Sequence, residues 1–214
     1  MYGDFSSLRS YLASILTDTL VGTDAAVEWR AVQHHPRLPF PGLRLDEAAQ
    51  QCLAAEWLEC RPLLSEDLTV RYRPRTFIPN TQATVAAFAE ASDAGVGDEV
   101  RQLLFNAYWA NGDDIGDPEV LRRLVAAPLR RGTSTARPVA QSGYAVTLAH
   151  GPVTSGAYRR IQAWNQDWHA AGVRDASEVI LIDKAGQVFA GPKALLELVS
   201  AGRAASASKL SPAL

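Results

Sequence analysis

The sequence predicts an α/β fold, in which a mixed sheet of four strands carries helices on both faces and a large α-helical insertion. Three observations predict it. A strand–helix–strand unit occupies the first 33 residues. Helical patterns then continue for more than a hundred residues after the Pro-rich segment 34–42. A helix, two strands joined by a tight turn and a final helix close the chain.

The N-terminal unit begins with a short candidate strand, Met1–Phe5. Two serines precede the segment Leu8–Leu20, in which leucine and isoleucine recur at helical spacing. Val27–Gln33 alternates and carries β-branched and aromatic residues, which is typical of a second strand. We expect the crossover between these parallel strands to be right-handed.

Caps and glycine stops predict the helices of the insertion. Asn80 can cap one helix, Asp117 followed by Pro118 can begin another, and Gly112 ends the helix between them. The polar segment Arg130–Pro138 is predicted to be a loop. The predicted helices are Asp46–Cys60, 80–93, Gly97–Asn111 and Val120–Leu129.

The C-terminal part supplies the remaining elements. They are a helix at Tyr158–Ala171, strands at Glu178–Asp183 and Val188–Ala190, and a helix at Lys193–Ala201. Without the insertion, this order is that of a thioredoxin-like fold. We therefore expect a discontinuous thioredoxin-like domain (1–42 and 158–203), a helical insertion (43–157) and a frayed tail (204–214).

Composition excludes several classes of function. The 214 residues have a net charge of −2, so a general affinity for nucleic acid or anionic lipid is not expected. No apolar stretch reaches the ~20 residues of a membrane span, and the first residues do not resemble a secretion signal. We expect a cytoplasmic protein without nucleic-acid or membrane partners, for which a homodimer stays open.

The two cysteines give no redox signal. Cys52 and Cys60 fall in one predicted helix, where eight positions span ~12 Å, too far for a disulfide. There is no C-x-x-C pair, and no histidine has the spacing of a metal motif. We expect both thiols to be reduced and structural, and no metal site.

Three segments carry a resemblance to a known family. They are Asp4–Ala13, Arg75–Asn80 together with Ala107–Leu121, and Gly172–Ile182. Together they resemble the DsbA-like branch of the thioredoxin superfamily. That branch includes disulfide oxidoreductases, kappa-class glutathione transferases and 2-hydroxychromene-2-carboxylate isomerases.

The departures from that family bear on function. Ser7 and Ser10 fall where the oxidoreductases carry their two cysteines, and Ser177 falls where the family has a cis-proline. A hydroxyl cannot form a mixed disulfide, so we expect no dithiol–disulfide exchange. A cis peptide before a non-proline residue costs ~2.5–4 kcal/mol, so the Ala176–Ser177 peptide is expected to be trans.

Two interpretations of Ser7 stay open. Its hydroxyl can cap the helix Leu8–Leu20. The resemblance instead implies that a serine here binds the sulfur of a small thiol, glutathione or mycothiol, where the helix N-terminus favours an anion. Arg9 opposes the helix dipole, which indicates an anionic ligand or a nearby carboxylate such as Asp4. The alternative is a solvated arginine at the surface.

The sequence therefore supports two functions. One is a thiol-dependent transferase or isomerase with Ser7 as its catalytic residue and an apolar substrate under the helical insertion. The other is a degenerate, non-catalytic thioredoxin-fold protein that binds a partner. In the first, the thiol and substrate would be contacted by Arg9, Ser10, Ala176, Ser177 and Trp109, although an aromatic residue at helical spacing is also typical of a core.

Overall fold

A four-stranded mixed sheet forms the centre of the molecule. The structure, a computed structural model, describes residues 1–65, 68, 70–173 and 178–210. The sheet has the order β2-β1-β5-β6, with β1 parallel to β2 and antiparallel to β5, and β5 antiparallel to β6. Its strands are β1 (Tyr2–Gly3), β2 (Arg30–Ala31), β5 (Ile180–Ile182) and β6 (Val188–Ala190). This arrangement confirms the predicted fold class.

Helices cover both faces of the sheet. Successive side chains along β1 point to opposite faces, so Tyr2 and Gly3 each meet a different helix. The Tyr2 hydroxyl donates to Asp167 of α7 (Ser155–Ala170) at 3.3 Å. On the opposite face, a Cβ on Gly3 would lie 2.6 Å from Oγ of Ser10 in α1 (Leu8–Asp18). Helix α1 also packs against α8 (Pro192–Leu210).

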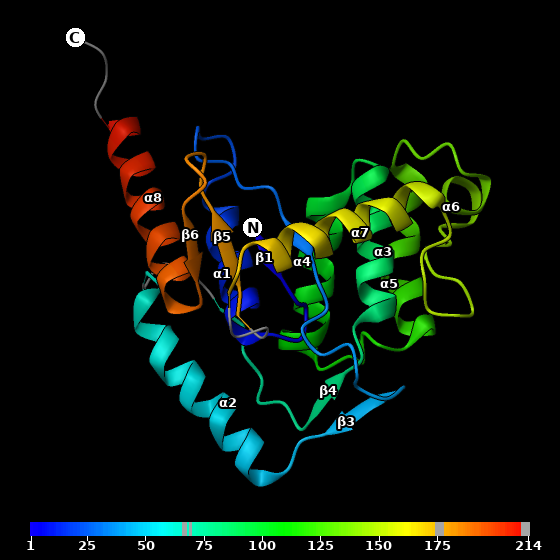
Figure 1. Cartoon of the computed structure of the whole chain (residues 1–214), viewed down its shortest axis with the longest axis horizontal. Coiled ribbons are helices and arrows are strands. Elements are labelled where there is room, and N and C mark those ends of the chain that lie inside the picture. Colours follow the sequence, from blue (N-terminus) through cyan, green and yellow to red (C-terminus); the bar gives the residue numbers. More distant parts are fainter. Residues whose placement is uncertain (66–67, 69, 174–177, 211–214) are drawn as a thin grey trace.

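The insertion is mostly helical, as predicted. Figure 1 shows α3, α5 and α6 gathered at one end of the molecule, and α8 at the other. Helix α7 packs along α3 and so joins the insertion to the sheet. The elements of this region are α2 (Glu47–Cys60), η1 (Arg61–Leu63), α3 (Gln82–Asp93), α4 (Gly97–Phe105), the π-helical turn η2 (Asn106–Asn111), α5 (Pro118–Arg131) and α6 (Arg137–Ser142).

The structure corrects three predictions of detail. A second, two-stranded antiparallel sheet of β3 (Gly42–Arg44) and β4 (Phe77–Pro79) was not predicted. The predicted loop Arg130–Pro138 is helical at both ends, because α5 continues to Arg131 and α6 begins at Arg137. The final helix continues to Leu210, so the tail 204–214 is helical over most of its length. The division into two domains stays a prediction.

An aromatic cluster joins the first loop to the insertion. The Phe5 ring lies 4.7 Å from that of Phe105 and 5.5 Å from that of Phe88, centroid to centroid. Tyr11 of α1 stacks on Trp109 of η2 at 5.9 Å. This core fixes the start of α1 against the helices of the insertion. No helix in the described ranges is long and apolar enough to cross a bilayer.

Candidate functional site

The loop between β1 and α1 is anchored by the buried carboxylate of Asp4. Its Oδ1 accepts hydrogen bonds from the Ser6 amide at 2.8 Å and the Ser6 hydroxyl at 2.9 Å. Its Oδ2 accepts from the His34 amide at 2.7 Å and the Thr81 hydroxyl at 3.1 Å. The two bonds to Oδ2 tie this loop to the segments after β2 and before α3, and the two bonds to Oδ1 stay within the loop, so Asp4 is a structural anchor here.

Ser7 is the N-cap of α1. Its backbone is extended (φ −89°, ψ 128°), and its Oγ accepts a hydrogen bond from the Ser10 amide at 3.3 Å. The side chain is half-buried. Ser7 therefore caps α1 in the structure, as one of the two interpretations expects. The proton of the Ser7 hydroxyl stays available to another acceptor.

Ser10 is fully buried, and its hydroxyl belongs to the packing of the fold. Its Oγ accepts from the Asp4 amide at 3.2 Å. A Cβ built on Gly3 would lie 2.6 Å from the same oxygen, so Ser10 packs directly against β1. Ser10 is thus held between β1 and α1 and offers no open surface to a ligand.

Arg9 is surrounded by carboxylates. This favours a nearby carboxylate as the reason for a cation in the first turn of α1. Its Nη1 lies 2.6 Å from Oε1 of Glu178, and its Nε lies 3.3 Å from Oε1 of Glu56. Its Nη2 lies 3.7 Å from Oε2 of Glu59. The expected carboxylate partner exists, but it comes from α2 and from the residue 178 before β5, and not from Asp4.

The carboxylates around Arg9 make this region acidic. Burial raises the pKa of Glu56 above its usual value, and the neighbouring carboxylates raise it further against the attraction of Arg9. Burial opposes the positive charge of Arg9, but Glu56 and Glu178 raise the pKa of its guanidinium overall. Since one guanidinium faces three carboxylates, there is little positive charge left here to stabilise a thiolate.

Cys60 lies beside the same cluster. It is fully buried and free, whereas Cys52 is exposed and free. Burial raises the pKa of the Cys60 thiol, and Glu56 and Glu59 add to this, although Arg9 lowers it. A buried thiol with a raised pKa is a weak nucleophile, so the surroundings of Cys60 do not favour redox chemistry.

Trp109 does not join Ser7 in an open cleft. Trp109 is fully buried, and its indole N–H donates to the Phe5 carbonyl at 3.0 Å. Its neighbours Tyr11, Tyr72 and Tyr108 are aromatic, so Trp109 belongs to the core. Ala176 and Ser177 lie outside the described residues, and the predictions made for them stay predictions.

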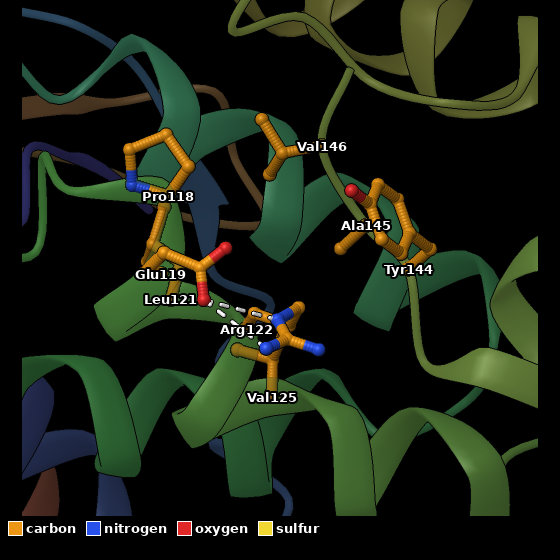
Figure 2. A pocket seen from close by; sticks show the side chains of 8 residues that line it. All are labelled: Pro118, Glu119, Leu121, Arg122, Val125, Tyr144, Ala145 and Val146. Carbon is orange, nitrogen blue, oxygen red and sulfur yellow. Dashed lines mark hydrogen bonds and ion pairs between the residues drawn. The ribbon is translucent and has the colours of Figure 1, made fainter. Parts of the chain in front are cut away.

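Several cavities lie elsewhere in the molecule. Figure 2 shows a small one between α5 and the segment 144–146, in which the carboxylate of Glu119 faces Arg122. Its volume of about 40 Å³ has room for a water molecule but not for a substrate. A larger one, of about 670 Å³, is lined by Met1, Tyr2, Leu198 and their neighbours at the other end of β1 from Ser7.

Among the residues that the structure describes, no group of three or more His, Cys, Asp or Glu could hold a metal ion.

The fold is shared with known structures. The chain has the DsbA-like thioredoxin fold, with a large helical insertion between its β-α-β and α-β-β-α halves. No protein-family model and no curated protein matches the sequence.

Two solved structures are similar to this chain. One is a probable DsbA oxidoreductase from Streptomyces coelicolor, with a TM-score of 0.66 and 14% identity over 100% of this chain and 91% of that one. The other, from Nitrosomonas europaea, is described as a protein disulfide isomerase, with a TM-score of 0.52 and 15% identity over 94% of both chains. At these identities the likeness establishes the fold.

Sequence reasoning missed the residues that surround Arg9. Glu56 and Glu59 lie on α2 and Glu178 precedes β5, so no local pattern connects them with the start of α1. The available signal was Arg9 itself, because a cation in the first turn of a helix needs a compensating charge.

Proposed function

We propose that this chain is a non-catalytic thioredoxin-fold binding protein, which kept the scaffold of the DsbA-like proteins without their dithiol–disulfide exchange. The observation that carries this proposal is the carboxylate cluster around Arg9. A redox centre at the start of α1 needs a stabilised thiolate, and three carboxylates close to the first turn have the opposite effect.

The chemistry of the side chains supports the same proposal. Ser7 and Ser10 carry oxygen where electron exchange needs sulfur. Ser10 and Asp4 are both fully buried, and their side chains accept hydrogen bonds from backbone amides of the fold. Cys60, the nearest described thiol, is buried in the same cluster with a raised pKa.

Reduction of insulin by dithiothreitol tests the proposal. We expect the full chain to leave the rate of insulin precipitation at the rate with dithiothreitol alone. A rate clearly above that, lost in the Cys60→Ser variant and kept in Cys52→Ser, would overturn the proposal, because it would make Cys60 a working nucleophile.

A second candidate function rests on Ser7. Its hydroxyl is half-buried at the N-terminus of α1 and acts as an acceptor towards the Ser10 amide, which leaves its proton for a ligand sulfur. This supports a thiol-dependent transferase or isomerase that uses glutathione or mycothiol. Ser7 would stabilise the thiolate of the bound cofactor, and an apolar substrate would pack beside it.

Titration calorimetry with glutathione and with mycothiol separates the two candidates. The transferase or isomerase predicts binding of one thiol that is lost in Ser7→Ala and kept in Ser142→Ala, a matched variant at an exposed serine. The absence of heat with both thiols would exclude it and favour the non-catalytic protein.

A further inference from the structure

Two arginines converge in a pocket that the proposed function does not use. The pocket lies where residues 73–77 meet the end of η2, and it has a volume of about 230 Å³. Arg73, Arg75, Tyr108, Gly112 and Asp113 are among the residues that line it. Its lining includes no residue from the first turn of α1, so it is separate from the site around Ser7.

The two guanidinium groups meet over Gly112. This glycine has a left-handed backbone (φ +91°) and ends the helical run of α4 and η2. A Cβ built on it would lie 3.2 Å from Nη1 of Arg75 and 3.4 Å from Nη1 of Arg73. The missing side chain therefore lets both cations share one side of the pocket.

The Arg75 side chain is held in place from within the fold. It is only 6% exposed; its Nε donates to the Arg73 carbonyl at 2.7 Å, and its Nη1 donates to the Tyr108 carbonyl at 2.5 Å. Its guanidinium also lies over the Tyr108 ring, 5.4 Å from the centroid. Arg73 is exposed, and its Nη1 donates to the Asn111 carbonyl at 3.1 Å.

The positive charge of this pair has no ion-pair partner among the residues that the structure describes. Within the described ranges, no carboxylate lies in ion-pair distance of either guanidinium, although Asp113 also lines the pocket. Both arginines bond carbonyls at the C-terminal end of a helix, which carries roughly half a negative charge against their two positive ones. Burial lowers the pKa of Arg75, and the charge of Arg73 lowers it further.

Helix capping explains only part of this arrangement. It engages one nitrogen of each arginine, and Nε of Arg75 donates to the Arg73 carbonyl outside the helix. The Nη2 atoms of both side chains donate no hydrogen bond to any described residue. A guanidinium has a planar fork of donors that matches two oxygens of one anionic group. The unused donors and the uncompensated charge lie on the same pocket.

We propose that this pocket binds an oxyanion, the phosphate or carboxylate group of a small molecule, between Arg73 and Arg75. The fixed guanidinium of Arg75 forms the floor of the site, and the exposed Arg73 completes it from the rim. The volume admits the anionic group and a small organic body but is below the range of drug-sized ligand pockets.

Titration calorimetry with inorganic phosphate and with succinate, at constant ionic strength set by chloride, tests this proposal. We expect at least one probe to bind the full chain, and Arg73→Gln to weaken that binding roughly tenfold or more. Arg71→Gln is the matched control, because it removes an exposed arginine two residues away that does not line the pocket. Binding of phosphate alone or of succinate alone identifies the kind of oxyanion.

The proposal is overturned if neither probe binds, or if Arg73→Gln and Arg71→Gln weaken binding equally, which would mean general charge attraction. Arg75→Gln should also abolish binding, and its melting temperature shows whether the fold persists. Since the pocket is independent of Ser7, these results leave the proposed function untouched.

Discussion

Single polar side chains at the start of α1 have structural partners that account for their presence. Asp4 accepts four hydrogen bonds from three segments, and Ser10 accepts the Asp4 amide. A buried carboxylate is tolerated when its lone pairs are satisfied in this way. At the scale of the residue, the first loop is therefore organised as a framework, and Ser7 is the one hydroxyl in it with some exposure and an unassigned proton.

The cap formed by Ser7 can be tested by stability. We expect Ser7→Ala to lower the free energy of unfolding by about 1 kcal/mol, because the Ser10 amide loses its acceptor. Ser7→Asn should retain most of the stability, because asparagine is an equally good cap. Urea unfolding measures both; equal losses in the two variants would contradict the capping role.

At the scale of the elements, the packing between β1 and α1 depends on Gly3. A Cβ on Gly3 would lie 2.6 Å from Oγ of Ser10 and 2.8 Å from the Trp29 ring. Both side chains are buried, so neither can move away without disturbing the core.

We expect Gly3→Ala to cost about 1–3 kcal/mol of stability, the usual range for an overpacked core. Gly151→Ala is the control, because the nearest atom to its Cβ would be Oγ1 of Thr147 at 3.8 Å. Thermal unfolding of both variants measures the difference. A Gly3→Ala protein as stable as Gly151→Ala would show that α1 does not approach β1 this closely.

Helix α2 contributes a pH dependence through Glu56. Burial raises the pKa of Glu56 in the folded protein above its ordinary value, so the folded state holds this proton more tightly than the unfolded chain. Stability is then lost as the pH rises from the unfolded value through the raised folded value.

We therefore expect the stability of the wild type relative to Glu56→Gln to fall as the pH rises from 4 towards 8. Urea unfolding across this range measures the difference, with Glu119→Gln as a control for the loss of an exposed carboxylate paired with an arginine. A difference that instead grows in favour of the wild type would mean that the pair with Arg9 outweighs the cost of burial.

Elements with strong local signals could be predicted from the sequence, whereas those that depend on distant partners could not. Strand β6 occupies the three predicted residues, and Asp117 caps α5 through the Glu119 amide. The two-stranded sheet of β3 and β4 was missed because each strand has only three residues, lies next to or contains a proline, and pairs with a segment far along the chain. The ion pairs of Arg9 were missed for the same reason of distance.

On the scale of the whole molecule, Arg9 connects three parts of the chain. Its carboxylate partners come from α2 and from residue 178 before β5, so the insertion and the C-terminal half both contact the first turn of α1 through ion pairs. The DsbA-like fold is thus combined with two serines, Ser7 and Ser10, at the start of α1 and with a carboxylate cluster beside them. The arginine pocket near η2 provides a separate place for an anionic ligand.

The central claim is that the chain cannot cycle between a dithiol and a disulfide. The direct measurement is to equilibrate the full chain with mixtures of reduced and oxidised glutathione, alkylate the free thiols and weigh the intact protein. We predict that no intramolecular disulfide forms at any mixture, because Cys52 and Cys60 lie eight positions apart on one helix and Cys60 is buried. An intramolecular disulfide between them that forms and breaks with the ratio of the two glutathione forms would contradict it.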